Sequence, residues 1–270
     1  MAEEASNAQP VEIAFEQVSL GFDDTPVLED VSFAVRRGAT KVLWGEAGAG
    51  KSVLLKLAVG LLRPDAGRVE VLGEAVSALP ESVLYDLRRR IGIVFQESAL
   101  FDSLTVRENV AFRLNEERRQ TEEEIEQRVR TVLAQVGLEE AIDKMPAELS
   151  GGMQRRVSIA RALATAPEIM LYDSPTGGLD PLTATTIMEE IIKLRDLHRV
   201  TALLVSHRLQ DGLLMATHVW DAGSKRLRSA PEQATRTTFL VLRGHRVQFD
   251  GTATEMQASQ DPYLQHFLRP

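Results

Sequence analysis

Residues 45–52 constrain the fold of this chain more than any other segment. They read Gly-Glu-Ala-Gly-Ala-Gly-Lys-Ser, which is one glycine, four residues and then Gly-Lys-Ser. An apolar run at 40–44 precedes the segment and a helical pattern at about 52–61 follows it, as a phosphate-binding loop between a strand and a helix requires. In such a loop, backbone N–H groups surround a phosphate, Lys51 reaches the β- and γ-phosphates, and Ser52 ligates Mg²⁺. The pattern therefore predicts a nucleoside triphosphate site rather than a plain glycine turn.

The other apolar runs predict an α/β fold. Beyond the run at 40–44, strand-type runs lie at 11–20, 27–35, 68–72, 91–95, 169–172, 202–205, 218–221, 239–241 and 246–249. A helical pattern covers about 105–164 and a further helix about 183–198. Buried strands that alternate with helices indicate a parallel sheet. The last runs suggest a β-hairpin with a long connection, in which residues 222–237 form a surface loop or a docking element for a partner subunit.

Composition limits the class of protein. The chain has 270 residues with 44% hydrophobic residues, enough for one large domain, which we place at 11–251 between a flexible tail at 1–10 and a helical tail at 252–270. A net charge of −8 makes a nucleic-acid partner improbable, and the absence of cysteine excludes thiolate chemistry. The first ten residues lack the features of a secretory signal, and no apolar run is long enough to span a bilayer.

Four further signals are weak when each is taken alone. Ser150, Gly151 and Gly152 open a helical run, where free N–H groups can hold an anion but where a simple N-cap is equally common. Asp173 ends an apolar strand, as an aspartate that orders a Mg²⁺ shell does. Gln96 and His207 each follow a strand, where most residues are ordinary loop residues.

Together these signals, in this order along the chain, resemble one family, the ABC ATPases. The resemblance covers about 13–251, and Leu-Ser-Gly-Gly-Met joined to a P-loop is its most specific part. It implies a P-loop NTPase core with a parallel sheet, an N-terminal antiparallel β subdomain and a helical insertion at about 97–165. It also implies ATP and Mg²⁺ as ligands. A second ATPase subunit would close over the nucleotide with its signature, the Leu-Ser-Gly-Gly-Met segment at 149–153.

The resemblance assigns site residues by position. The nucleotide would be held by Phe22, Gly45, Glu46, Ala47, Gly48, Ala49, Gly50, Lys51, Ser52, Val53, Ser150, Gly151, Gly152 and Asp180. Ser52, Gln96 and Asp173 would serve Mg²⁺, and Gln96, Asp173, Ser174 and His207 would lie at the reacting phosphate.

A closer resemblance is to the Mce/Mla branch of this family. It is carried by the string Phe-Gln-Glu-Ser-Ala-Leu-Phe-Asp-Ser-Leu-Thr-Val at 95–106, by Met145-Pro146, and by the terminal Asp-Pro and Phe-Leu pairs. This branch implies phospholipid transport with transmembrane permease, Mce-type and periplasmic lipid-binding partners. It also implies a peripheral position on the cytoplasmic face of the inner membrane.

One departure from the family pattern affects the chemistry. Ser174 follows Asp173 where the family has a glutamate that positions or deprotonates the attacking water. Because a serine is not a carboxylate base, slow hydrolysis is expected, unless another acid or a partner ATPase supplies the group or the serine was introduced experimentally. Milder departures are Val53, Phe22 and Arg208, which replace a usual threonine, tyrosine and acid.

Three alternatives to a lipid-transport ATPase remain open at this stage. The chain could energise an importer for another substrate, or act as an ATP-gated assembly clamp with little turnover. A soluble ABC protein that acts on ribosomes or DNA is disfavoured, because the chain has neither a second cassette nor a long coiled coil.

Overall fold

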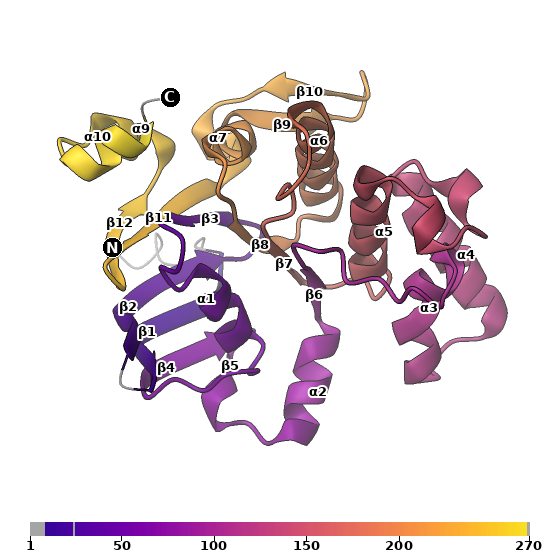
Figure 1. Cartoon of the computed structure of the whole chain (residues 1–270), viewed down its shortest axis with the longest axis horizontal. Helices are drawn as coiled ribbons and strands as arrows, with labels where there is room; N and C mark the ends of the chain where they lie inside the picture. Colours follow the sequence, from indigo (N-terminus) through magenta and orange to yellow (C-terminus); the bar gives the residue numbers. More distant parts are fainter. Residues whose placement is uncertain (1–8, 24, 269–270) are drawn as a thin grey trace, which may run out of the picture.

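The computed structural model describes residues 9–23 and 25–268. Most of the predicted flexible tail, residues 1–8, therefore lies outside the described residues. Figure 1 shows a central sheet with an antiparallel sheet on one side and helices on the other, and a separate helical region beside it. This is the α/β architecture that the sequence predicts.

The central sheet has six strands in the order β12-β11-β3-β8-β7-β6. The strands are β3 (Thr40–Gly45), β6 (Ile91–Val94), β7 (Ile169–Asp173), β8 (Thr201–Val205), β11 (Thr237–Arg243) and β12 (Arg246–Gly251). All neighbours are parallel except β12, which pairs antiparallel with β11. Every residue of β3 and β8 is buried, which explains their continuous apolar runs, because a parallel sheet is covered on both faces.

The second sheet is antiparallel and has the order β2-β1-β4-β5. Its strands are β1 (Val11–Phe22), β2 (Thr25–Arg36), β4 (Ala66–Val71) and β5 (Glu74–Ala75). With α1 (Lys51–Ala58) and α2 (Glu81–Arg89), this sheet packs on one face of the central sheet, where Leu43, Leu171 and Leu203 point. The alternate residues Val42, Tyr172 and Leu204 point into a second core on the other face. Two cores thus follow from the period-two alternation along the central strands.

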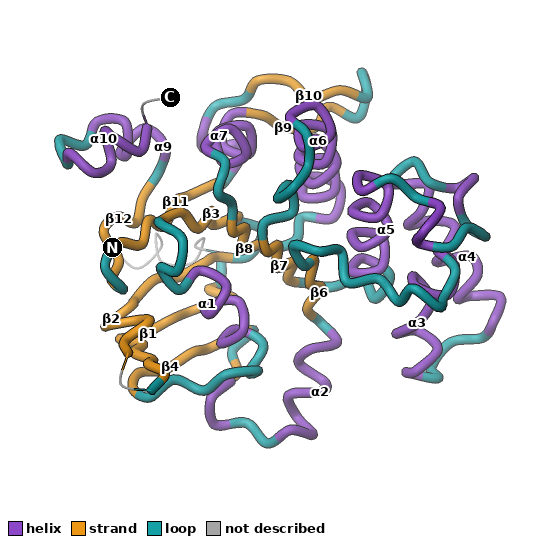
Figure 2. The backbone as a smooth tube through the Cα atoms, viewed as in Figure 1, coloured by secondary structure: helices purple, strands orange, loops and turns teal. Residues whose placement is uncertain are grey.

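Three helices form the region at one end of the central sheet, to the right in Figure 2. They are α3 (Val106–Glu117), α4 (Glu122–Gln135) and α5 (Gly151–Leu163). Thr105 and Thr121 begin α3 and α4 with complete capping boxes, which fix where these charged helices start. Among residues 9–23 and 25–268, no helix has both the length and the apolar character that a membrane crossing requires.

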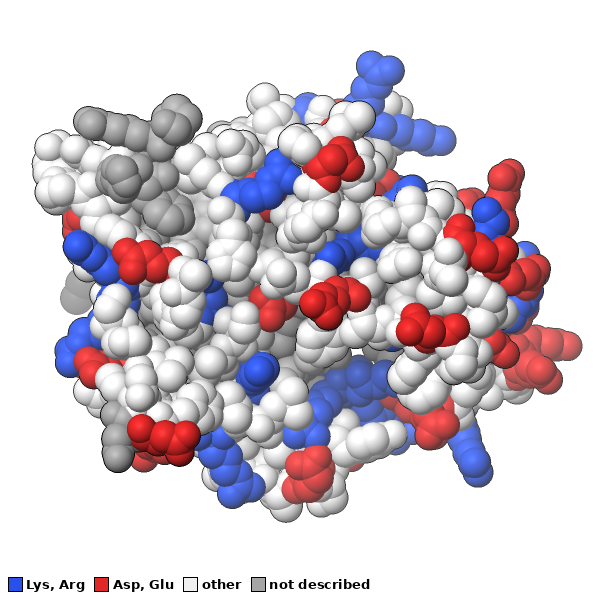
Figure 3. Space-filling model, viewed as in Figure 1, with Lys and Arg blue, Asp and Glu red and all other residues white. Residues whose placement is uncertain are grey.

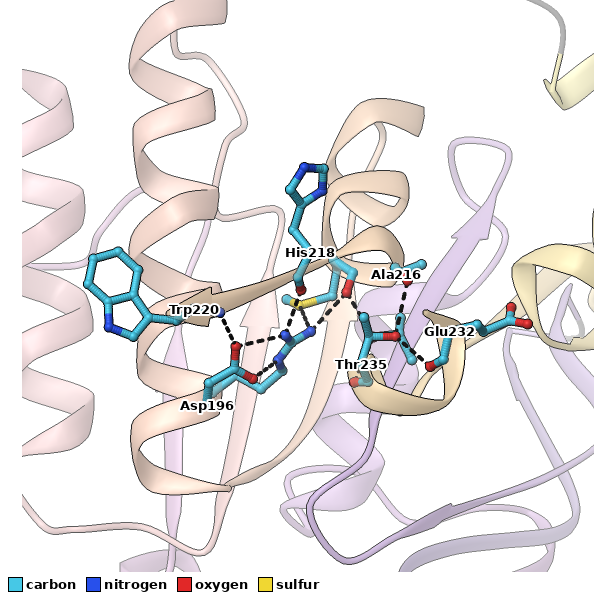
Figure 4. Close-up of polar contacts among 9 residues, drawn as sticks. Asp196, Ala216, His218, Trp220, Glu232 and Thr235 are labelled. Carbon is cyan, nitrogen blue, oxygen red and sulfur yellow. Dashed lines mark hydrogen bonds and ion pairs between the residues drawn. The ribbon is translucent and has the colours of Figure 1, made fainter. Parts of the chain in front are cut away.

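The prediction of a surface loop across residues 222–237 is wrong. This part contains β10 (Arg226–Ser229), which pairs with β9 (His218–Asp221), and the short helix α8 (Glu232–Thr235). Figure 4 shows contacts that tie β9, the partner strand of β10, to α6 (Pro181–His198), and that tie α8 to α7 (Leu209–Thr217). Asp196 accepts from the Trp220 N–H at 2.6 Å, and the Thr235 hydroxyl donates to the Ala216 carbonyl at 3.1 Å. These partners lie 19 and 24 residues away along the chain, so local composition does not reveal them.

The chain ends in two short helices. These are α9 (Ala253–Ala258) and α10 (Pro262–Leu268), and they pack through Met256 and Leu264 against the second core. The Arg243 guanidinium lies over the Tyr263 ring, 4.5 Å from its centroid. The C-terminal helices are thus part of the folded body.

Candidate functional site

The predicted site residues gather where β3, β7 and β8 end. These parallel strands are neighbours in the order β3-β8-β7, and all three are followed by loops at the same edge, near the middle of Figure 1. The carboxyl ends of parallel strands are where α/β proteins bind ligands. Lys51 begins α1 directly after the loop that follows β3, Asp173 is the last residue of β7, and His207 lies in the loop after β8.

The loop after β3 has a backbone that only glycine accommodates easily. Gly45 has φ of +143°, and a Cβ there would lie 2.4 Å from the Leu242 carbonyl oxygen. Gly48 has φ of +79° with no atom within 4 Å of a Cβ position, so it borders open space. No side chain caps the start of α1, which leaves its first N–H groups available to an anion.

Lys51 lies inside this loop and is only 4% exposed. Its ammonium donates to the carbonyl oxygens of Gly45 at 2.9 Å and Glu46 at 2.7 Å. Burial lowers the pKa of Lys51, and the nearby charges of Asp173 and Glu46 oppose that shift. The ammonium of Lys51 is therefore a buried cation that donates to neutral carbonyl groups. An anionic ligand can attract it away from them.

Ser52 and Asp173 meet at the first turn of α1. The Ser52 hydroxyl donates to Asp173 Oδ1 at 3.0 Å, although the residues are 121 positions apart. A hydroxyl and a carboxylate are oxygen ligands of the kind that Mg²⁺ takes when it also binds phosphates and water. Their convergence beside the phosphate loop fits a Mg²⁺ site.

Gln96 and His207 belong to the loops after β6 and β8. Gln96 is exposed after β6 and packs beside Gly177 in the loop after β7, where a Cβ on Gly177 would lie 3.3 Å from Gln96 Cγ. The protein around the His207 imidazole lowers its pKa by excluding water, and the charge of Lys51 lowers it further, while Asp173 opposes both. His207 is thus held as a neutral ring close to these charges.

Ser174 occupies an unusual position directly after Asp173. It is 2% exposed and has φ of +47°, in the left-handed region. Its N–H donates to the Val205 carbonyl at 3.0 Å, but within the described part of the chain its hydroxyl has no hydrogen-bond partner. A buried hydroxyl without a partner is costly, and such groups mark positions where a ligand or water is expected.

The signature residues do not join this site within one chain. Ser150 caps α5 by accepting from the Met153 N–H at 3.3 Å, and both Ser150 and Gly151 are exposed. Gly152 packs under α6, where a Cβ would lie 2.5 Å from Thr183 Cγ2. Figure 2 shows α5 and α1 on opposite sides of the central strands. The N-terminus of α5 therefore faces outward, free to meet another molecule.

Phe22 and Asp180 belong to other elements, the end of β1 and the start of α6. Phe22 ends β1 and is 47% exposed, so its ring is available for stacking. Asp180 caps α6 by accepting from the N–H groups of Leu182 and Thr183. Hydrogen bonds from Thr183 lower the pKa of Asp180, which keeps this carboxylate ionised at the protein surface.

Sequence reasoning missed Arg155, which connects several of these segments. This residue of α5 is 4% exposed and donates to the carbonyl of Phe95 at 2.6 Å, to that of Gln96, and to that of Gly177 at 3.4 Å. Its partners are up to 60 residues away, so no local spacing could have identified it.

Comparisons with known proteins agree with this geometry. The family model described as ABC transporter matches residues 28–177. The chain is 34% identical over 242 residues to the intermembrane phospholipid transport system ATP-binding protein MlaF of Escherichia coli K12, covering 90% of this chain and 82% of MlaF. It is 45% identical over 183 residues to the methionine import ATP-binding protein MetN of Rhizobium meliloti, covering 68% of this chain and 51% of MetN.

A solved structure of similar fold is a dimeric ATP-binding cassette in a post-hydrolysis state, bound to ADP and Pi. It aligns with a TM-score of 0.73 at 28% identity, covering 89% of this chain and 98% of that chain. The predicted P-loop NTPase fold is therefore confirmed. Since the family model spans more than half of the chain and MlaF is similar over nearly all of it, this protein belongs to the ATP-binding subunits of ABC transporters.

Proposed function

We propose that this chain binds and hydrolyses MgATP at the ends of β3, β7 and β8, as the ATPase of a phospholipid transporter. The observation that carries the proposal is the contact of Ser52 with Asp173 beside the buried ammonium of Lys51. Lys51 would bind the β- and γ-phosphates, and Ser52, Asp173 and Gln96 would hold Mg²⁺, directly or through water. When bound, Mg²⁺ neutralises charge on the phosphates.

A second copy of the chain would complete the site. Ser150 and Gly151 are exposed at the N-terminus of α5, on the other side of the fold from α1. The free N–H groups there favour an anion, which suits the γ-phosphate held by a partner subunit. This arrangement accounts for a signature that contacts nothing in its own chain's phosphate loop.

A hollow beside Gln96 offers a place for a transmembrane partner. It has a volume of about 390 Å³, and its lining includes Phe95, Phe101 and Phe112 together with Arg88, Arg113 and Arg161. Figure 3 shows Lys and Arg side chains in the hollow between α2 and α3, whereas acidic side chains concentrate over α3 and α4 at the edge of the molecule. Exposed aromatic side chains ringed by arginine are typical of protein contact sites. Motion of Gln96 at the nucleotide would be transmitted to a permease bound there.

Phospholipid is the proposed cargo because similarity to MlaF extends over 90% of this chain, whereas similarity to MetN stops at 68%. With that cargo, the partners would include permease subunits, Mce-type proteins and periplasmic lipid-binding proteins. The chain would then lie peripherally on the cytoplasmic face of the inner membrane.

A second candidate function is an ATP-gated clamp that assembles a complex with little turnover. The buried Ser174 favours it, because a serine hydroxyl stands where the family has a carboxylate. Slow phosphate release from the assembled complex, combined with stable ATP-dependent closure, would favour the clamp over the motor.

Lys51→Ala tests nucleotide binding. We expect ATP affinity to fall by about tenfold or more, because a hydrogen bond to a charged group contributes roughly 1.5–3 kcal/mol. Titration of the purified chain with a fluorescent ATP analogue measures the change. Lys56→Ala is the matched control, since Lys56 is exposed on the same helix. Equal affinities for the two variants would contradict the phosphate-loop assignment.

The cargo is tested with the transporter reconstituted in liposomes together with its membrane partners. We expect MgATP to drive transfer of a fluorescent phospholipid, and expect the Lys51→Ala complex to lose it, because the loop can no longer hold the phosphates. ATP hydrolysis stimulated by methionine, without ATP-dependent movement of phospholipid, would favour the importer alternative instead.

A further inference from the structure

Asp211 is a buried carboxylate that the nucleotide site described above does not use. It lies in the first turn of α7 and is 2% exposed. Its Oδ2 accepts from the Thr176 hydroxyl at 2.5 Å and from the Ser206 hydroxyl at 2.7 Å. Two hydroxyl donors on one oxygen offset part of the cost of burying the charge.

The two donors belong to the loops after β7 and β8, which carry Ser174 and His207. Thr176 lies two residues after Ser174, and the Gly177 N–H closes this turn on the Ser174 carbonyl at 2.9 Å. Ser206 immediately precedes His207, and its hydroxyl oxygen accepts from the Arg208 N–H at 3.0 Å. A single carboxylate therefore joins the turn that carries Ser174 to the turn that carries His207.

The position of Asp211 is itself fixed against the strand of the phosphate loop. The next residue, Gly212, is packed so closely that a Cβ there would lie 2.3 Å from Cζ2 of Trp44. Trp44 is fully buried and directly precedes Gly45. The start of α7 therefore cannot shift relative to β3 without disturbing a close contact.

Arg208 completes the cluster from the solvent side. Its Nε lies 3.7 Å from Asp211 Oδ1, and its side chain is 28% exposed. This residue stands where an acid is common in the family, and here it gives the second carboxylate oxygen a positive neighbour. The unusual arginine beside His207 thus has a structural role in this chain.

We propose that Asp211 is a positioning residue of the hydrolytic site, which holds the Ser174 turn and the His207 turn in one arrangement relative to the phosphate loop. The inference rests on the proposed ATPase function. Asp211 has no part in holding the nucleotide, so its loss affects the rate of hydrolysis rather than ATP affinity.

Thr176→Val provides the test, because it keeps the shape of the side chain and removes one donor. We expect single-turnover phosphate release at saturating MgATP to fall by about tenfold, the size expected for a lost hydrogen bond to a charged group, with ATP affinity unchanged. Thr176→Ser restores the hydroxyl and should restore the rate to within about twofold. The full-length chain is compared in its parent form and in a Ser174→Glu background, where we expect faster turnover.

Thr235→Val is the matched control. Thr235 is 2% exposed, close to the 3% of Thr176, and donates its hydroxyl to the Ala216 carbonyl at 3.1 Å, but it lies in α8, away from both turns. Ser206→Ala removes the other donor to Asp211. It replaces Thr176→Val as the test variant if Thr176→Val does not fold.

Amide hydrogen exchange on the same variants gives a readout that needs no turnover. Thr176→Val should speed exchange of the Arg208 amide, on the other turn, by about tenfold, whereas Thr235→Val should not. If Thr176→Val matches Thr235→Val in both rate and Arg208 exchange, the positioning role is wrong. Failure of the parent chain to bind ATP would contradict the proposed function instead, and Arg208 exchange would still decide the role of Asp211.

Discussion

Replacing Ser174 with glutamate should raise single-turnover phosphate release by at least about tenfold, a value set below the roughly 10²–10⁴-fold that general-base assistance provides. In-line attack on the γ-phosphate needs a water opposite the leaving oxygen and an acceptor that orients it or takes its proton. Serine cannot accept that proton near neutral pH. ATP affinity should change little, because Ser174 does not belong to the phosphate loop.

The surroundings of Ser174 make it the place for this acceptor. Asp173 is already engaged with Ser52 at 3.0 Å, and Asp211 is engaged with two hydroxyls. Neither of these carboxylates hydrogen-bonds to the Ser174 hydroxyl, which has no hydrogen-bond partner within residues 9–23 and 25–268. A carboxylate introduced at this position would therefore displace no existing hydrogen bond of the Ser174 hydroxyl.

Ser174→Gln is the matched control for this experiment. Glutamine has the size of glutamate but is not a base, so this variant should stay near the parent rate. Single-turnover phosphate release would be measured on the assembled complex at saturating MgATP. Should glutamate and glutamine give the same rate, the missing carboxylate does not limit turnover, and a slow conformational step does.

Ser150→Arg should abolish ATP-driven dimerisation at micromolar concentrations while ATP binding by the single chain is retained. Ser150 is exposed at the N-terminus of α5, and the proposed closure brings it against the nucleotide of the other subunit. An arginine there replaces the cap and puts a bulky side chain into a closely packed contact, where overpacking typically costs about 1–3 kcal/mol at each of the two sites.

Sedimentation of the chain with and without MgATP measures this effect, and the slow hydrolysis expected with Ser174 should let the closed dimer accumulate. Thr121→Arg is the control, because Thr121 is likewise an exposed helix cap, at the start of α4. Dimerisation of Ser150→Arg equal to that of Thr121→Arg would show that the signature does not face the partner's nucleotide.

The sequence predicted the strands of the nucleotide site well because their signals are local. The apolar runs at 40–44, 91–95 and 202–205 lie within a residue or two of β3, β6 and β8. Continuous burial of a parallel strand leaves a continuous apolar run, and a glycine-rich loop marks where the strand before the helix ends.

Elements defined by distant contacts were not predicted. β10 is mostly exposed and rich in arginine, so its sequence lacks the apolar alternation that marks a strand. α2 and α7, with 9 residues each, have no counterpart among the elements that the sequence predicts. Asp211 and Arg155 similarly acquire their roles from partners brought together only by the fold.

The strand order of the central sheet has a consequence for how the chain is made. β3 is flanked by β8 and β11, and β11 leaves the ribosome roughly 200 residues after the phosphate loop, which at about 5–20 residues per second takes roughly 10–40 s. During that interval β1, β2 and β4 can pair with one another, but β3 has neither neighbour until β8 is made, and only one until β11 follows. The apolar strand β3 is therefore without a neighbour for much of synthesis, which makes the nascent chain prone to aggregation until β8 and β11 are made.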